Sequence, residues 1–296
     1  MKALVTGIAG FTGHYLAEAL AGRAISVVGL AQSAAVVKHV DRIHAVDITD
    51  FNALQGVVVA EKTDLVVHLA AISFVAHENI EEMYRTNVIG TRNLLEALTS
   101  LESAPRAIVL ASSSNVYGNR NEGIMRESMP PDPVNDYSVS KVAAEMVARL
   151  YQSRLPICIV RPFNYTGVGQ SPDFLIAKIV QHVRVRARAI RLGNLEVARD
   201  FSDVRFVAEA YCRILHCPKA PGRTVNVSSA RAYRLDEILT MVASISGHTL
   251  EVEVDPSLVR DNEVRRLWGD SSVLDEMVGP INRIPLEETL RWMLQG

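Results

Sequence analysis

The sequence has little cysteine, little lysine and a net charge close to zero. The three cysteines, Cys158, Cys212 and Cys217, show no CxxC spacing, so we expect reduced thiols in a reducing compartment and no disulfide framework. The eight histidines form no HExxH motif, which argues against a metal site. The formal net charge of −2 gives no electrostatic basis for binding nucleic acid or an anionic membrane.

Long apolar runs are also missing. No stretch approaches the roughly 18 residues that a membrane-spanning helix needs. Glycines and polar residues interrupt the start of the sequence where a signal peptide would be apolar. We therefore expect a cytoplasmic protein without a membrane or nucleic-acid partner. The 296 residues, 48% of them hydrophobic, suit one large domain with or without a smaller companion.

Short apolar segments alternate with longer amphipathic ones through the first half of the chain. The apolar segments are typical of buried parallel strands: Lys2–Val5, Ile25–Leu30, Asp64–Leu69, Ala107–Ala111 and Ile157–Val160. The amphipathic segments are predicted helices: Phe11–Ala21, Asn79–Ser100 and Asp136–Gln152. This order predicts an α/β fold, a doubly wound parallel Rossmann sheet with right-handed crossovers.

The regular alternation ends after Pro162. The second half contains predicted helices at 174–189 and 234–247, a β-like segment at 249–254, and a strand, 224–227, that returns to the main sheet. We therefore expect two interleaved parts. Residues 1–163, with return segments at about 194–230, would form the dinucleotide-binding domain, and residues 164–296 a smaller C-terminal α/β substrate lobe.

The segment TGIAGFTG, residues 6–13, lies directly after the first strand and opens the first helix. Its glycines let the backbone approach a pyrophosphate, whose charge the helix N-terminus favours. The spacing is GxxGxxG and not the GxGxxG of the classical fingerprint. A glycine-rich turn without a ligand is the alternative, which the place of the segment in a βαβ chain disfavours. The predicted contacts with the dinucleotide are Gly7, Gly10, Phe11, Thr12 and Gly13.

The end of the second strand bears on the choice between NADH and NADPH. Many NAD sites carry an acid there that binds the ribose 2′-hydroxyl. Here the strand is followed by Gln32 and Ser33, and the next acid is Asp41. No carboxylate would repel a 2′-phosphate, although no Arg would bind it and Lys38 is the nearest candidate. The sequence favours NADPH and leaves NADH open.

A YxxxK motif places Tyr137 and Lys141 on one face of a predicted helix, with Asp136 positioned to cap it. An ammonium beside a phenol is expected to lower the pKa of Tyr137 from about 10, as a proton donor near neutral pH requires. A serine cluster, residues 112–114, follows the fifth strand, where a hydroxyl would stabilise negative charge on a substrate oxygen. Either motif alone is weak, and the serine cluster alone would be a turn.

As an ordered set, these motifs resemble the extended short-chain dehydrogenases that act on nucleotide sugars. The resemblance rests on TGIAGFTG, HLAA (68–71), TNVIGTRNLLEA (86–97), SSSNVYG (112–118), YSVSK (137–141) and RPFNYTGVGQ (161–170). It implies that Ser113, Tyr137 and Lys141 are catalytic, that Lys141 also holds the nicotinamide ribose, and that Asn87 organises the site. Further cofactor contacts implied by the resemblance are Asp47, Ile48, Leu69, Ala70 and Ala71. For Asp47, a turn or cap residue before Thr49 remains the alternative.

The second half looks most like the GDP-4-keto-6-deoxymannose reductases and their dehydratase relatives. By this resemblance Asn164 meets the sugar diphosphate, Arg199 and Arg260 bind the phosphates, and Glu263 binds a ribose hydroxyl. Surface ion pairs are the alternative for the last three. The run of arginines from Arg184 to Arg191 has no such support and is expected to be a solvated face.

Two departures from the dehydratase pattern favour a reductase and a dimer. A dehydratase needs a carboxylate directly after the catalytic hydroxyl, and Ser114 and Asn115 occupy those positions. Gln32 and Ser33 replace the paired Arg associated with tetramers, so we expect a homodimer built on the helices 79–100 and 136–152. A 4,6-dehydratase or 4-epimerase that recycles its NAD(P) remains the alternative enzyme. A sensor that binds dinucleotide without turnover is disfavoured because all three catalytic residues are present.

Overall fold

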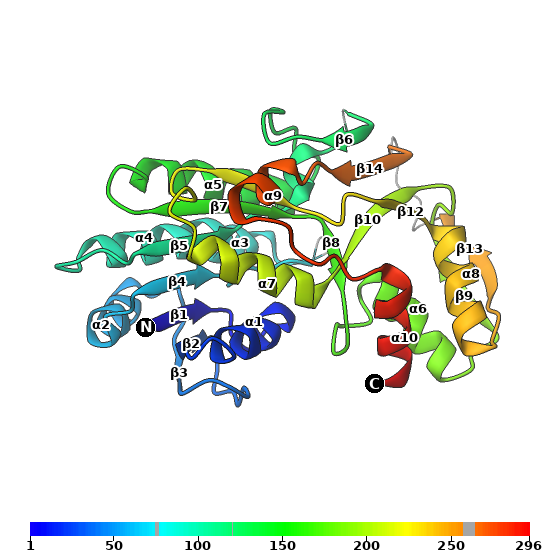
Figure 1. Cartoon of the computed structure of the whole chain (residues 1–296), viewed down its shortest axis with the longest axis horizontal. Coiled ribbons are helices and arrows are strands. Elements are labelled where there is room, and N and C mark those ends of the chain that lie inside the picture. Colours follow the sequence, from blue (N-terminus) through cyan, green and yellow to red (C-terminus); the bar gives the residue numbers. More distant parts are fainter. Residues whose placement is uncertain (75–76, 120, 257–263) are drawn as a thin grey trace.

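The fold centres on a parallel seven-stranded sheet in the order β11-β7-β5-β4-β1-β2-β3 (Figure 1). A computed structural model describes residues 1–74, 77–119, 121–256 and 264–296. The strands are β1 (Lys2–Thr6), β2 (Ser26–Ala31), β3 (Arg42–Ala45), β4 (Leu65–His68), β5 (Ala107–Ala111), β7 (Ile157–Pro162) and β11 (Thr224–Val227). The predicted doubly wound fold is confirmed, and the strand 224–227 returns to the main sheet beside β7.

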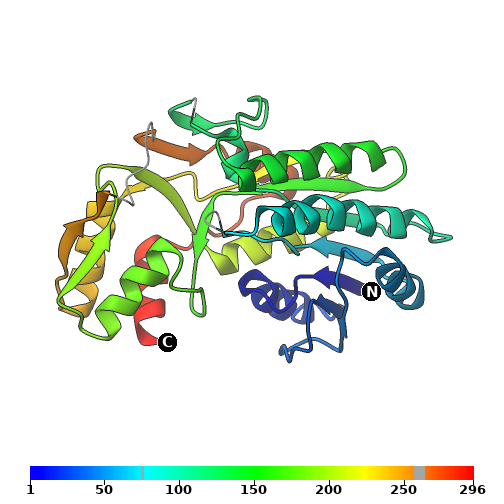
Figure 2. The same cartoon turned by 180° about the vertical axis from the view of Figure 1, so that it is seen from behind.

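Helices cover both faces of this sheet (Figures 1 and 2). One face packs against α1 (Phe11–Ala21), α7 (Val204–Leu215) and α9 (Ser272–Val278). The other face packs against α2 (Phe51–Glu61), α4 (Thr91–Thr99) and α5 (Asp136–Tyr151). Alternate β1 residues supply the two cores, with Ala3 and Val5 on the first face and Leu4 on the second. None of the described helices combines the length and apolar character that crossing a bilayer requires.

The predicted helix 79–100 is divided by a π turn. It consists of α3 (Ile80–Tyr84), the π-helical η1 (Arg85–Gly90) and α4. A Cβ on Gly90 would lie 2.4 Å from the side chain of Ile48, so only glycine allows this close contact. The π turn adds a residue to the helical path and turns Asn87 inward, where it is fully buried.

The C-terminal lobe has its own hydrophobic core between α6 (Leu175–Arg184), α8 (Leu235–Ser246) and α10 (Leu286–Gln295). A small sheet pairs β9 (Ala189–Leu192) with β13 (Glu251–Val254). A second sheet has the order β12 (Ala232–Arg234), β10 (Ala198–Asp203), β14 (Arg266–Gly269), β6 (Gly123–Met125), and β8 (Asn164–Thr166) also pairs with β10. Within this second sheet, β10 contacts both α7 beside the main sheet and α10 in the lobe.

Predicted helix ends in the lobe are partly wrong. The helix predicted at 174–189 stops at Arg184, because Arg186 has φ +51° and the chain then enters β9. By contrast, α8 ends at Gly247, whose φ of +65° is the left-handed cap that the sequence predicts.

Candidate active site

The carboxyl ends of β1, β4 and β5 are neighbours in the sheet, and a predicted site segment follows each strand. The glycine-rich loop follows β1, the HLAA segment follows β4, and the serine cluster follows β5. Helix α5, which carries Tyr137 and Lys141, packs beside α4 and the turn after β5. The topology therefore gathers motifs that are more than 100 residues apart at one edge of the sheet.

The glycine-rich loop has the shape of an anion cradle. Gly7 has φ +68°, and a Cβ at this position would lie 2.8 Å from the backbone nitrogen of Ala70. A Cβ on Gly13 would lie 2.2 Å from the carbonyl oxygen of Ile8, so the first turn of α1 packs directly on the loop. No side chain caps α1, which leaves backbone N–H groups of its first turn free to bind an anion. These features fit a dinucleotide pyrophosphate.

Phe11 and Thr12 connect this loop to the second half of the chain. The Thr12 hydroxyl lies 2.8 Å from the Tyr165 hydroxyl, and the Phe11 ring stacks on the Tyr165 ring with centroids 6.2 Å apart. Their side chains are therefore engaged with β8. Phe11 and Thr12 can therefore bind an anion only through their backbone N–H groups at the start of α1.

Asp47 and Ile48 lie beyond the carboxyl end of β3. Asp47 is exposed, and its carboxylate accepts a hydrogen bond from the Thr49 backbone at 2.8 Å, so in this structure it is a turn residue. Ile48 is buried, and its carbonyl accepts a hydrogen bond from the Asn93 side chain at 3.1 Å. Neither contact tests the predicted binding of adenine.

Tyr137 is buried, and burial raises the pKa of its phenol to about 12, while a hydrogen bond with Ser113 lowers it. The expectation of a lowered pKa is therefore wrong for this structure, because desolvation of the phenolate outweighs the favourable contact. The phenol is protonated at neutral pH. Its contact with Ser113 brings together two of the three predicted catalytic residues.

Lys141 lies one turn farther along α5. Its Nζ donates a hydrogen bond to the carbonyl of Ala111, 2.5 Å away, at the end of β5. Burial lowers the pKa of Lys141 to about 8, and the nearby Glu145 partly offsets this effect. The ammonium is thus held beside the serine cluster and remains mostly charged at neutral pH.

Asn135, and not Asp136, caps α5. The Asn135 side chain accepts a hydrogen bond from the Ser138 backbone at 2.9 Å, and the Ser138 hydroxyl contacts the Asn135 backbone in return. Asp136 occupies the first turn, where it accepts a hydrogen bond from the Tyr84 hydroxyl at 3.0 Å. The predicted cap is therefore wrong by one residue.

A buried ion pair that sequence reasoning missed supports the serine cluster. Arg161 donates from Nε and Nη2 to the two carboxylate oxygens of Glu145, at 2.8 and 2.7 Å. Ser112 donates to the same carboxylate at 2.6 Å. The Arg161 guanidinium also lies over the Tyr117 ring, 4.9 Å from its centroid. Both charged side chains are only 2% exposed.

Asn164 and Arg199, the predicted diphosphate contacts, come from the paired strands β8 and β10. The side chain of Asn164 is exposed and donates to the carbonyl of Asp200 at 3.1 Å. Arg199 is partly exposed and donates to its neighbouring carbonyl at 2.9 Å. The other two predicted contacts, Arg260 and Glu263, lie outside the described residues.

Asp200, which the sequence did not single out, is the centre of this region. It is fully buried, and its carboxylate accepts hydrogen bonds from Ser228, from the Ser229 backbone at 3.0 Å and from the Ser229 hydroxyl at 2.7 Å. It thus ties β10 to the segment after β11.

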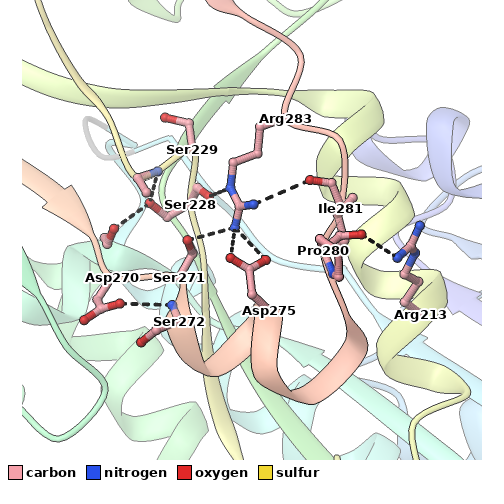
Figure 3. Close-up of polar contacts among 12 residues, drawn as sticks. Arg213, Ser228, Ser229, Asp270, Ser271, Ser272, Asp275, Pro280, Ile281 and Arg283 are labelled. Carbon is pink, nitrogen blue, oxygen red and sulfur yellow. Dashed lines mark hydrogen bonds and ion pairs between the residues drawn. The ribbon is translucent and has the colours of Figure 1, made fainter.

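Arg283 also contacts the segment after β11, through the carbonyl of Ser228 (Figure 3). It donates to both carboxylate oxygens of Asp275 and to the Ser271 hydroxyl, at 2.8 to 2.9 Å, and to the carbonyl of Ser228 at 3.4 Å. Sequence reasoning missed this arginine because its partners come from two other segments, the turn after β11 and the start of α9.

The residues that the structure describes contain no group of three or more His, Cys, Asp or Glu side chains arranged to hold a metal ion.

Comparison with protein families gives a match over nearly the whole chain. Residues 4–293 match the family described as GDP-mannose 4,6 dehydratase. A GDP-6-deoxy-D-talose 4-dehydrogenase from Aggregatibacter actinomycetemcomitans is 33% identical, with 94% of this chain and 92% of the relative aligned. A GDP-6-deoxy-D-mannose reductase from Pseudomonas aeruginosa is 31% identical, with 99% and 96% aligned.

Solved structures show the same architecture. A candidate epimerase from Burkholderia cenocepacia J2315 superposes with a TM-score of 0.93 at 44% identity, covering 99% of this chain and 97% of that one. The structure of RMD from Pseudomonas aeruginosa, complexed with NADPH, superposes with a TM-score of 0.86 at 30% identity and the same coverage.

Proposed function

The chain belongs to the GDP-mannose 4,6 dehydratase family, and on this basis we propose that it reduces the 4-keto group of a GDP-4-keto-6-deoxy sugar with NADPH or NADH. The substrate would be GDP-4-keto-6-deoxymannose and the product GDP-rhamnose or GDP-6-deoxytalose. The relatives named as acting on GDP-6-deoxy-talose and GDP-6-deoxy-mannose support this substrate class. A 4,6-dehydratase or 4-epimerase that recycles its cofactor is the second candidate, which a GDP-mannose 4,6-dehydratase relative at 28% identity supports.

The residues at the sheet edge fit a nicotinamide dinucleotide. In this proposal the glycine-rich loop and the start of α1 hold the pyrophosphate, and Leu69, Ala70 and Ala71 line the adjacent surface. Asp47 and Ile48 lie toward the adenine, and Lys141 holds the nicotinamide ribose. When bound, the cofactor supplies the hydride that reduces the sugar carbonyl. Residues 1–163 with the return segments would form this half of the site, and residues 164–296 would hold the nucleotide sugar.

The proton comes from Tyr137. Its phenol, with a pKa raised to about 12, carries a proton at neutral pH and donates it to O4 of the sugar as the carbonyl becomes an alcohol. The Ser113 hydroxyl contacts the phenol and is placed to hydrogen-bond the same oxygen. Lys141, charged below its pKa of about 8, stabilises the phenolate that remains. Asn164, Arg199, Arg260 and Glu263 would hold the GDP portion.

The observation that favours a reductase is that neither of the two residues directly after Ser113 carries a carboxylate. Ser114 is buried and Asn115 is exposed, and neither side chain can give up a proton at neutral pH. Glu145 does approach this group, but Ser112 and Arg161 occupy both of its oxygens. Elimination of water from C6 needs such an acid, whereas reduction at C4 does not.

We therefore expect the protein to oxidise NADPH one-for-one when it is given preformed GDP-4-keto-6-deoxymannose. Given GDP-mannose and oxidised cofactor, it should form no 4-keto-6-deoxy product. Mass spectrometry separates the outcomes, because dehydration lowers the mass of the sugar by one water. Dehydration of GDP-mannose without net use of cofactor would overturn the reductase assignment and support the second candidate. Asn115→Asp tests the chemistry further, since any trace of elimination should appear only in that variant.

The nucleotide should be distinguished as well. We expect GDP to raise the melting temperature more than UDP or dTDP at equal concentration, since ligand binding stabilises the folded state by RT ln(1 + [L]/Kd). A tenfold difference in Kd corresponds to about 1.4 kcal/mol. Equal shifts for the three nucleotides, or the largest shift for dTDP, would redirect the substrate assignment while leaving the redox chemistry untested by this assay.

We also propose a cytoplasmic homodimer. Large apolar side chains are exposed along one face of α5, with Met146 61% and Leu150 76% exposed, and α5 lies beside α4 on the outer surface of the sheet (Figure 2). Exposed apolar side chains at helical spacing are typical of an interface, and a two-fold axis would bring the same helices of two copies together.

Replacing both Met146 and Leu150 with Glu should convert the dimer to a monomer. Each buried charge would occur twice in a two-fold interface, so we expect dimer affinity to fall by roughly 100-fold or more. Light scattering after size-exclusion chromatography measures the mass of the protein. Val185→Glu, at an exposed position in the lobe, is the control that should leave the mass unchanged. A wild-type protein that already elutes as a monomer would refute the proposed dimer.

A further inference from the structure

His68, the last residue of β4, is a buried polar residue that the proposed mechanism does not use. It is 3% exposed, and its ring bridges two elements that are distant in the sequence. Its Nδ1 lies 2.7 Å from the hydroxyl of Thr6, at the end of β1, and its Nε2 lies 2.9 Å from the hydroxyl of Thr91, at the start of α4.

The donor and the acceptor in each hydrogen bond around His68 can be assigned in only one way. The Thr91 hydroxyl donates its one proton to the carbonyl of Asn87, 2.7 Å away, because a carbonyl can only accept. The Thr91 oxygen must therefore accept from Nε2–H of His68. In the neutral ring Nδ1 is then the acceptor, and the Thr6 hydroxyl donates to it. The Thr6 oxygen in turn accepts the N–H of Ala70 at 3.1 Å.

Burial keeps this ring neutral. Burial, together with the positive charge of Lys141, lowers the pKa of His68 to about 3. A neutral ring has one donor and one acceptor, which is what the two threonines require.

The chain of hydrogen bonds continues into the catalytic helix. The Asn87 side chain donates to the Ser140 hydroxyl at 2.9 Å, and Ser140 donates to the carbonyl of Tyr137 at 2.7 Å. Asn87 also holds the backbone of Ile72 through two hydrogen bonds of 2.8 and 3.1 Å. The segment 69–72 is thus fixed at both ends, at Ala70 by Thr6 and at Ile72 by Asn87.

We propose that His68 is a positioning residue, which as the Nε2–H imidazole locks the segment 69–72 and the Tyr137 turn of α5 into one rigid unit. Ala70 touches the glycine-rich loop at Gly7, so this unit joins the surface proposed for the cofactor to the proton donor. This role of His68 rests on the proposed reduction, because the rigid unit would keep the hydride source and the Tyr137 phenol at a fixed separation. Small losses of alignment in such a site lower the rate far more than the affinity.

Three variants and one control test this role in the full-length enzyme. His68→Leu removes both hydrogen bonds and should lower kcat roughly tenfold or more, with the KM for the keto sugar changed by less than about twofold. The hydride isotope effect measured with deuterated NADPH should rise as the chemical step becomes limiting. His68→Gln keeps one donor and one acceptor and should recover most of the rate. Thr91→Val should resemble His68→Leu, while Thr99→Val, at the other end of α4, should match wild type.

The tautomer of the His68 ring can be measured directly, and this test needs no substrate. In protein labelled with ¹⁵N-histidine, the signal that disappears in His68→Gln should show the Nε2–H tautomer and stay unchanged from pH 5 to 9. A signal that titrates in this range, or that belongs to the Nδ1–H tautomer, would overturn the proposal.

Kinetic outcomes can overturn it as well. A folded His68→Leu or Thr91→Val with unchanged kcat and isotope effect would show that the contact is only structural. If His68→Leu does not fold, His68→Gln, Thr91→Val and the ring signal still decide. If the wild type fails to reduce GDP-4-keto-6-deoxymannose, the proposed function fails alone, and the ring signal, which needs no substrate, still tests the tautomer on which the role of His68 depends.

Discussion

Tyr137→Phe should lower turnover by roughly 100-fold or more, which is the usual contribution of a general acid. The substitution removes only the hydroxyl, and the phenyl ring keeps the buried position and the packing of α5. The affinity for NADPH should stay within about threefold of wild type, because the glycine-rich loop and the segment 69–72 are unchanged. Stopped-flow absorbance at the reduced nicotinamide band measures the rate, and fluorescence titration measures the affinity.

A matched control uses another buried tyrosine. Tyr211→Phe, in α7, removes a hydroxyl close enough to influence Tyr137 electrostatically but outside the proposed proton transfer. We expect it to retain most of the activity. A Tyr137→Phe variant with more than about a third of wild-type turnover would remove the phenol from the mechanism.

Glu145→Gln should cost about 3 kcal/mol of unfolding free energy or more, because it leaves the buried Arg161 guanidinium without a counter-charge. Burial lowers the pKa of Arg161, but its hydrogen bonds with Glu145 outweigh this and raise the pKa above its ordinary value. The variant loses this support, but the ordinary pKa of arginine lies so far above neutral that the buried guanidinium stays charged and cannot relieve the cost by releasing a proton. The Ser112 hydroxyl also loses its carboxylate acceptor, so Ser113 should be less well ordered.

Urea unfolding followed by circular dichroism measures this loss as a lower midpoint with an unchanged slope. Glu287→Gln provides the control, since its ion pair with Arg291 is more than half exposed on both sides and should contribute less than about 1 kcal/mol. If the two variants were equally stable, the buried pair would not hold the serine cluster in place.

The sheet and the glycine-rich loop were predictable because their signals are local. The strands β1, β4, β5 and β7 are continuous apolar runs, and the loop lies between the first strand and the first helix. The π turn at Arg85–Gly90 was not predictable, because an extra residue in one turn barely changes the amphipathic pattern. The strands of the lobe are short, and β10 buries the charged side chain of Asp200, which resembles no strand pattern.

In the candidate site, too, only the features with local sequence signals were predictable. The motifs predicted which residues gather at the sheet edge, but the pKa of Tyr137 depends on burial, which a motif does not reveal. Glu145 looks like an ordinary charge on a helix surface until Arg161, from a different element, is placed against it. His68 was part of a quoted motif, yet its role depends on Thr6 and Thr91, and these are far away in the sequence.

The path of the chain between the main-sheet domain and the C-terminal lobe determines how the protein unfolds. After β7 the chain enters the lobe, returns through α7 and β11, leaves again through β12, and comes back through α9 before it ends in α10. The core on one face of the main sheet is completed by Phe206, Val225 and Leu274, which lie on these return passages. No single cut can therefore release either part with its own core intact. The two parts should melt together in one cooperative transition, and a fragment ending at residue 163 would expose that face of the sheet.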